Sequence, residues 1–337
     1  MVLALLLAMA AQAQEAKCDL VRGAALQEEA RNAMSGRQFA LAARRLEEAV
    51  AACPSNRSGL LGLAEARAAA REFDSAIRAA ERYLEGDPDS VAGRVLLAGA
   101  YLMARRPKEA LAESERVLGH HPAEAAALKI KGNAAYLVGD TGKAIETFIR
   151  LLDGHPADEE GAYMLGRIYY QEGRIDLAIG QFERALKISP GSYKALDNLG
   201  LCYAAIGDDE KAIRYFLGAI KLVERDHPEY EWPYINIADL LLKKDDPQRA
   251  FDAASKAANR NPMSARSFYV GAKALERLDK GEQALNWTQR AAALDPDYSD
   301  ALYLMARLYG RLGQAEKAEE ARQRFLAVKA KEPGRRK

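Results

Sequence analysis

Proline recurs along this chain at a fixed interval. Five prolines are each 34 residues apart, and three more continue at the same interval after an insertion of four residues: Pro54, Pro88, Pro122, Pro156, Pro190, Pro228, Pro262 and Pro296. A repeat of this length is typical of a small supersecondary unit that is used many times and buries its apolar face against its neighbours. The interval therefore constrains the fold more than any other feature of the sequence.

Nine repeats follow when these prolines, apart from Pro228 after the four inserted residues, are placed at the thirty-second position of their repeats. They cover residues 23–332 and begin at Gly23, Arg57, Val91, Ala125, Glu159, Tyr193, Glu231, Ala265 and Ser299. The twentieth position is Ala in all nine repeats, and the eighth is always Ala or Gly. Small residues at both positions predict two helices that cross with their backbones close together.

The residues between these positions have the pattern of amphipathic helices. Apolar residues follow at steps of three and four, as in Ile175, Ile179 and Phe182. Gly or Asp occupies the centre of several turns, and a helix-breaking Pro closes most repeats. The chain has 66 Ala among 337 residues and only 12 Pro, which also favours helix. We therefore expect an all-α chain in which each repeat is a pair of helices.

The composition argues against several classes of function. There are 49 Lys and Arg residues against 48 Asp and Glu, whereas proteins that bind nucleic acid cluster cations in clear excess. Three Cys are too few for a disulfide-built scaffold or a zinc site made of four thiolates. The sequence has no Gly-rich phosphate loop, no His-Glu-x-x-His and no nucleophile elbow. We predict no catalytic residues, no metal site, no cofactor and no nucleic-acid partner.

The repeats resemble the tetratricopeptide-repeat (TPR) family. The fifth repeat carries most of the family motif, in two parts: Ala162, Leu165, Gly166 and Tyr169, then Ala178, Phe182, Ala185 and Pro190. Other repeats depart from the motif, for example with Arg67 in place of the Tyr and Ala80 in place of the Phe. The resemblance implies a right-handed α-solenoid superhelix of about nine TPR helix pairs, in which the first helix of each pair lines the concave face.

The resemblance also implies which side chains line that concave face. In repeats four to eight its positions hold mainly aromatic, Asn and cationic residues: Lys129, Asn133, Tyr136, Tyr163, Arg167, Tyr170, Lys194, Asn198, Trp232, Asn236 and Tyr269, together with Met164, Asp197, Asp239, Arg266 and Lys273. In repeats two and three the same positions hold Leu61, Ala68, Ala69, Val95, Leu96 and Leu102. Asn can pair with both backbone N–H and C=O groups, while Tyr and Trp supply apolar area, so the polar set suits an extended peptide.

Two functions fit these expectations. The first is a non-enzymatic protein–protein interaction scaffold that binds a partner polypeptide in the concave groove. The second is a carbohydrate-binding or assembly component of an envelope complex for polysaccharide synthesis, polysaccharide export or secretion. Sugar binding needs aromatic faces spaced as stacking platforms, whereas peptide binding needs a regular ladder of Asn side chains.

The two ends of the chain lie outside the repeats. Residues 1–13 combine an apolar run with Ala11-Gln12-Ala13, the small-x-small pattern that signal peptidase reads, although no Lys or Arg precedes the run. We interpret this segment as a signal peptide of an exported bacterial protein, periplasmic or secreted. Residues 14–22 are then an N-terminal extension, and residues 333–337 are a basic tail.

Two of the three cysteines are expected to form a disulfide. Cys53 ends the second helix of repeat one, and the two helices of a repeat run antiparallel. That end therefore lies near the start of the first helix, which Cys18 shortly precedes. Export would place the pair in an oxidising compartment, where such a bridge persists.

The signal peptide gives the first testable prediction. Cleavage after Ala13 should leave a mature chain that begins at Gln14, because the Ala-Gln-Ala site directly follows the apolar run. Mass spectrometry of the protein isolated from its native cell measures this directly. A chain that still begins at Met1 would contradict the prediction of export.

Overall fold

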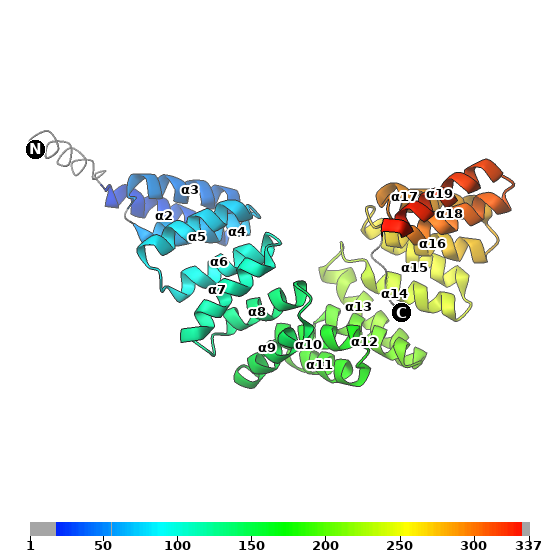
Figure 1. The fold of residues 1–337 in the computed structure, drawn as a ribbon, viewed down its shortest axis with the longest axis horizontal. Helices are drawn as coiled ribbons and strands as arrows, with labels where there is room; N and C mark the ends of the chain where they lie inside the picture. Colours follow the sequence, from blue (N-terminus) through cyan, green and yellow to red (C-terminus); the bar gives the residue numbers. More distant parts are fainter. Residues whose placement is uncertain (1–17, 55, 332–337) are drawn as a thin grey trace, which may run out of the picture. The chain divides into compact units, whose positions relative to one another are not determined.

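The computed structural model describes residues 18–54 and 56–331. These residues form 18 α-helices and no strand (Figure 1). The helices are α2 (Leu20–Ser35), α3 (Phe39–Ala52), α4 (Arg57–Ala69), α5 (Phe73–Gly86), α6 (Val91–Met103), α7 (Pro107–His120), α8 (Ala125–Leu137), α9 (Thr141–Gly154), α10 (Glu159–Gln171), α11 (Ile175–Ile188), α12 (Tyr193–Ala205), α13 (Asp209–Asp226), α14 (Trp232–Lys243), α15 (Pro247–Arg260), α16 (Ala265–Arg277), α17 (Gly281–Leu294), α18 (Ser299–Arg311) and α19 (Ala315–Lys331). The expected all-α architecture of about nine helix pairs is confirmed.

Each even-numbered helix is the first helix of a repeat and each odd-numbered helix is the second. Two first helices differ from the expected start. The helix α2 begins at Leu20 rather than Gly23, because the Asp19 side chain accepts a hydrogen bond from the backbone N–H of Arg22 and caps it. The helix α14 begins at Trp232, with Glu231 as its N-cap. The predicted signal peptide, residues 1–13, and the basic tail, residues 333–337, lie outside the described residues.

The chain divides into two units within α10, between Ile168 and Tyr169. The N-terminal unit holds α2 to α9 and most of α10, and the C-terminal unit holds α11 to α19. In both units a helix packs mainly against its neighbours in sequence, and a first helix also contacts the first helix of the next repeat, as α6 does with α8 and α14 with α16. The first helices of each unit therefore share one continuous face. None of the described helices combines the length and the apolar character that a membrane span requires.

The regular spacing of small residues has the expected structural basis within each repeat. The Ala at the twentieth position is fully buried in repeats one to eight. At the eighth position, a methyl group added to Gly132 would lie 2.7 Å from the ring of Phe148, far inside van der Waals contact. A methyl group on Gly200 would collide in the same way with the ring of Phe216. The absence of a side chain at these glycines allows the two rings to fill the crossing of the helices.

The eighth and twenty-fourth positions vary together across seven repeats. Repeats with Phe at position twenty-four have Gly at position eight, and repeats with a smaller residue there have Ala. The Phe–Gly combinations are Phe148 with Gly132, Phe182 with Gly166 and Phe216 with Gly200, and the others are Ala80 with Ala64, Ser114 with Ala98, Ala254 with Ala238 and Thr288 with Ala272. The departures from the family motif are therefore volume-compensated pairs that preserve close packing.

The first repeat is tied to its own N-terminal end by a covalent bond. Cys18 and Cys53 form a disulfide, with their Cα atoms 4.2 Å apart. The backbone N–H of Asp19 also donates to the carbonyl oxygen of Ala52 at 2.9 Å. The third cysteine, Cys202, is buried on α12 as a free thiol, and burial raises the pKa of this thiol to about 12.

The Phe–Gly packing predicts the effect of one methyl group. Gly200→Ala should lower the free energy of unfolding by roughly 1–3 kcal/mol, because the added carbon collides with the Phe216 ring in a filled core. Gly180→Ala on α11 is a matched control, since nothing lies within 4 Å of its added carbon, and it should raise stability by about 0.5–1 kcal/mol. Urea denaturation followed by circular dichroism measures both changes. Equal stability of the two variants would refute the close crossing.

Candidate functional site

The first-helix face of the C-terminal unit contains a cavity of about 400 Å³. It lies over α12, α14 and α16, and its lining residues are Leu201, Ala204, Phe216, Asn236, Asp239, Leu240, Leu242, Lys243, Arg266, Lys273 and Arg277. The floor is apolar, while the polar groups come from α14 and α16. A mainly apolar surface with a few convergent polar groups is the usual form of a binding site.

Asp239 is at the centre of the charges in this cavity. Its carboxylate accepts a hydrogen bond from Arg266 at 2.5 Å and another from Lys273 at 3.5 Å. Lys243 and Arg277 also line the cavity, and Arg277 is paired with Asp245 outside it, so three cations, Arg266, Lys273 and Lys243, share the one carboxylate of the cavity. The excess positive charge favours a ligand that carries negative charge.

Two tyrosines extend the site beyond the cavity. The rings of Tyr269 and Tyr298 lie 5.1 Å apart, and the Tyr298 hydroxyl accepts a hydrogen bond from Arg266 at 3.1 Å. Burial, followed by the nearby Asp300, raises the pKa of Tyr269 to about 12. Burial alone would lower the pKa of Arg266, but Asp239 and Tyr298 outweigh it and raise that pKa, so the guanidinium stays charged.

Asn236 is bonded to a buried carboxyl group. Its side-chain N–H donates to Asp197 Oδ1 at 2.9 Å, and Asp197 is only 3% exposed. The family positions predicted that Asp197 lines the open face, and this prediction is wrong. The side chain instead lies between α12 and α14, where burial raises the pKa of its carboxyl to about 7 and the bond from Asn236 opposes the rise.

The predicted residues of the N-terminal unit form a second polar cluster. The guanidinium of Arg167 lies 5.9 Å from the ring centre of Tyr136 and 5.9 Å from that of Tyr163. Lys129 pairs with Asp158 at 3.3 Å and with Glu160 at 3.4 Å. Burial would lower the pKa of Lys129, but these two carboxylates outweigh it and raise that pKa.

The other predicted residues lie on the same helices. Asn133 is half-buried on α8, Tyr170 is half-buried on α10, and Lys194 is exposed on α12. The Asn198 side chain donates to the backbone carbonyl of Lys194 at 2.8 Å, which ties its amide to its own helix. Trp232 is 45% exposed at the start of α14. The structure therefore distributes the predicted residues over both units rather than over one pocket.

Three polar residues of the C-terminal site were not predicted. Lys243 and Arg277 hold the thirteenth position of their repeats and line the cavity, and Tyr298 directly precedes repeat nine. The sequence could have indicated Lys243 and Arg277, because the thirteenth position of a repeat lies on the same face of the first helix as the ninth position. Nothing in the spacing marks Tyr298, which reaches the site only through its contacts with Tyr269 and Arg266.

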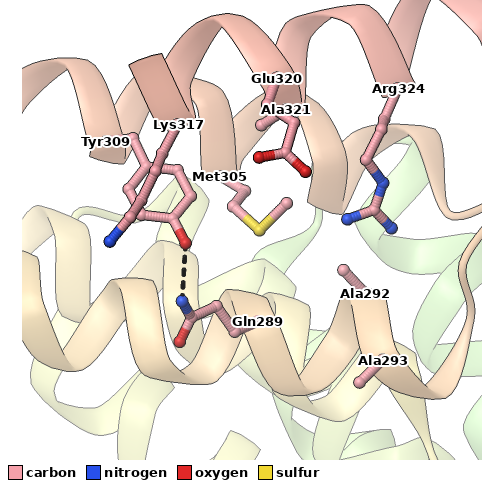
Figure 2. Close-up of a pocket in the computed structure, with 9 residues that line it drawn as sticks. All are labelled: Gln289, Ala292, Ala293, Met305, Tyr309, Lys317, Glu320, Ala321 and Arg324. Atoms are coloured by element: carbon pink, nitrogen blue, oxygen red, sulfur yellow. Dashed lines mark hydrogen bonds between the residues drawn. The ribbon is translucent and has the colours of Figure 1, made fainter. Parts of the chain in front are cut away.

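A second cavity lies on another face, between α17, α18 and α19 (Figure 2). Its volume is about 470 Å³. Met305, Ala292 and Ala321 supply its apolar walls, and Gln289 donates to the Tyr309 hydroxyl at 2.8 Å. None of the predicted residues lines it. Among residues 18–54 and 56–331, no group of His, Cys, Asp and Glu side chains is placed to hold a metal ion.

The buried Asp197 predicts a pH dependence of stability. The folded chain holds a proton on this carboxyl up to about pH 7, whereas the unfolded chain loses it near the ordinary aspartate pKa of 3.8. Unfolding between these values releases a proton, so the contribution of Asp197 to stability falls as the pH rises from about 4 to about 7. Asp197→Asn should therefore be more stable than the wild type at pH 8, by on the order of a few kcal/mol, and nearly equal to it near pH 4.

Urea denaturation of both proteins at the two pH values measures this difference. Asp176→Asn on α11 is the control, because it removes an exposed carboxylate without affecting the buried pair. A difference between wild type and Asp197→Asn that does not change with pH would show that the buried carboxyl does not titrate in this range.

Sequence comparisons agree with the repeat pattern. Three tetratricopeptide-repeat family models match the chain, the first at residues 28–91, 131–193 and 163–227, the second at residues 67–133, and the third at residues 287–320. No curated protein sequence matches the chain significantly. The matches to these repeat models support, in general terms, a role of this chain as a protein-interaction scaffold.

Two solved structures share the fold over most of this chain, and a third matches about half of it. A tetratricopeptide-repeat protein from Parabacteroides merdae is 19% identical, with a TM-score of 0.60 over 75% of this chain and 98% of that chain. A chain of the APC/C hetero-tetramer Cut9–Hcn1 is 17% identical, with a TM-score of 0.62 over 80% of this chain and 52% of that chain. MamA is 27% identical over 48% of this chain and 95% of that chain, with a TM-score of 0.45. Repeat spacing, helix pairs and matching family models together show that this chain belongs to the tetratricopeptide-repeat family.

Proposed function

We propose that this protein is a non-enzymatic scaffold that holds a partner polypeptide on the first-helix face of repeats six to eight. The observation that carries the proposal is the cavity over α12, α14 and α16, with its apolar floor and its excess of cations. Leu201 and Leu240 provide apolar contact, while Lys243 and Lys273 provide charge-assisted hydrogen bonds to acidic side chains.

The contacts within the site support a preformed surface. Arg266 is fixed by Asp239 and Tyr298, and Arg277 donates to the Leu242 carbonyl at 3.0 Å. Side chains that are already ordered lose less conformational entropy when a partner binds. A rigid, cationic cavity of this size holds two or three side chains of a peptide, with the remainder of the peptide following the first helices.

We also propose that the protein acts outside the cytoplasm. Two features support this location: the apolar N-terminal segment with its Ala-Gln-Ala site, and the Cys18–Cys53 pair at the start of the first repeat. Disulfides persist in the periplasm and outside the cell, whereas cytosolic thiols are kept reduced. The partner would then be a protein of the cell envelope or a secreted protein.

The binding site predicts which substitutions weaken the complex. A partner is first captured from envelope fractions by the wild-type protein, and its binding segment is then titrated by calorimetry. The double variant Lys243→Ala/Lys273→Ala should raise the dissociation constant about 10-fold or more, because each lost charge-assisted bond costs roughly 1.5–3 kcal/mol. The melting temperature should change little.

Lys187→Ala/Lys221→Ala is the matched control, since both lysines are exposed on the second helices α11 and α13. It removes the same charge away from the cavity and should leave the affinity within about 2-fold. Equal weakening by the two double variants would disprove specific binding at the cavity. Weakening only by Asn133→Ala/Tyr136→Ala would move the site to the N-terminal unit.

A further inference from the structure

The turn between the two helices of every repeat contains one residue with a positive φ. It is the fifteenth position of the repeat, and its φ lies between 55° and 85° throughout. Glycine holds this position in repeats four, five, six and nine, aspartate in repeats seven and eight, and arginine in repeats one to three: Gly139, Gly173, Gly207, Gly313, Asp245, Asp279, Arg37, Arg71 and Arg105. Glycine is the usual residue at such a helix end, because a side chain in this conformation costs roughly 1–2 kcal/mol. Five turns therefore carry a side chain where the backbone favours none.

The two aspartates have a partner that accounts for their presence. Arg277 lies 3.2 Å from Asp245, and Arg311 lies 2.9 Å from Asp279. Each arginine is the thirteenth residue of the following repeat. The geometry of the turn thus places the fifteenth side chain of one repeat beside the thirteenth side chain of the next.

The three arginines have no such partner among the residues that the structure describes. The residues in the partnering position are Ala69, Met103 and Leu137, none of which can accept a hydrogen bond from a guanidinium through its side chain. Met103 is 59% exposed and Leu137 is 57% exposed. In the part of the chain that the structure describes, no hydrogen bond or ion pair involves the side chain of Arg37, Arg71 or Arg105. We call these three residues the arginine row.

The surroundings of the arginine row are strongly cationic. Arg78 and Lys108 also lie in these turns or in the first helical turns that follow them, and no ion pair within 4 Å joins either of them to a carboxylate of the described residues. The carboxylates of Glu72 and Glu109 are already paired, with Arg67 and Arg106. Asp74 is the remaining acidic side chain of the described turn segments 36–41, 70–78 and 104–109.

A shallow cavity joins the turns of repeats two and three. Its volume is about 610 Å³, and its lining residues are Arg71, Glu72, Phe73, Asp74, Ser75, Arg78, Met103, Ala104 and Arg105. Cations and apolar side chains therefore alternate along one edge of the N-terminal unit, and Met103 and Leu137 are the exposed apolar residues of this edge. The order along this edge is Arg37, Ala69, Arg71, Met103, Arg105 and Leu137.

We propose that the arginine row binds an acidic segment of a partner polypeptide that carries apolar side chains between its carboxylates. Guanidinium groups bind carboxylates in bidentate fashion, and the interspersed Met103 and Leu137 require apolar groups on the same ligand. An anionic polysaccharide or a nucleic acid has no aliphatic side chains for these positions. Neighbouring helices pack roughly 8–10 Å apart. A polyproline II chain rises about 3.1 Å per residue with three residues per turn, so carboxylates at every third residue lie on one side of the peptide and match the row. This surface is separate from the cavity of repeats six to eight and does not depend on the function proposed for it.

A designed peptide tests the proposal on the full chain. The probe is a fluorescein-labelled peptide of four Glu-Ser-Leu triplets, titrated by fluorescence anisotropy, with the Gln-Ser-Leu analogue as the uncharged comparison. The variant Arg37→Gly/Arg71→Gly/Arg105→Gly replaces the row with the residue that repeats four to six already have in the same turn. Its melting temperature should be equal or higher, because glycine suits this backbone, while the dissociation constant should rise at least 10-fold.

The control variant is Arg22→Gln/Arg44→Gln/Arg82→Gln, which removes three exposed arginines of the same unit outside the row. Support for the proposal is tight binding of the acidic peptide, weak binding of the Gln analogue, and loss of affinity in the glycine variant alone. Equal loss in both variants would overturn it, because binding would then depend only on net charge. Failure of the wild type to bind the acidic peptide, or equally strong displacement of that peptide by polygalacturonate, would also overturn it.

Discussion

Close crossing of the two helices in each repeat is the constraint on which the structure depends. An Ala that is fully buried at the twentieth position in repeats one to eight and a small residue at the eighth keep the helix backbones near each other. The twenty-fourth side chain then fills the remaining space. Where it is a large ring such as Phe216, the facing residue is Gly200, and where it is as small as Ala254, the facing residue is Ala238. The combined volume of the eighth and twenty-fourth side chains is therefore restricted, while either residue can change if the other compensates for it.

Because the repeats are held together by their inner positions, their outer positions can differ while the fold is kept. The first-helix face demonstrates this freedom. Repeats two and three present aliphatic side chains such as Leu96, while repeats seven and eight present charged ones such as Lys273. The same position in the turn holds glycine, a salt-bridged Asp279 or an arginine such as Arg105. A single repeat architecture thus carries two surfaces of different chemistry, one on each unit.

The fold could be predicted almost completely from sequence, because a 34-residue period and two columns of small residues leave few alternatives. The candidate site was less predictable. Position within a repeat assigns a side chain to a face, but not its depth or its bonding partner. Asp197 has a position that faces the groove and is nevertheless buried, since Asn236 from the next first helix bonds to it. Contacts between repeats determine how deeply such a side chain is buried and which group it bonds to. The pattern within one repeat does not show these contacts.

Internal counterions decide which of the predicted polar residues remain available to a ligand. Lys129 has two carboxylates beside it, Asp158 and Glu160, so a ligand gains little from its charge unless it displaces them. In the C-terminal cavity the balance is reversed, because Asp239 is the one carboxylate among the residues that line it, and four cations line it too. Arg277 is paired with Asp245 outside the cavity, but one acid cannot neutralise the other three bases, and the remaining positive charge faces solvent over an apolar floor. The two polar clusters therefore differ in their electrostatic attraction for an acidic ligand, although the sequence gives both a similar set of Asn, Tyr and cationic side chains.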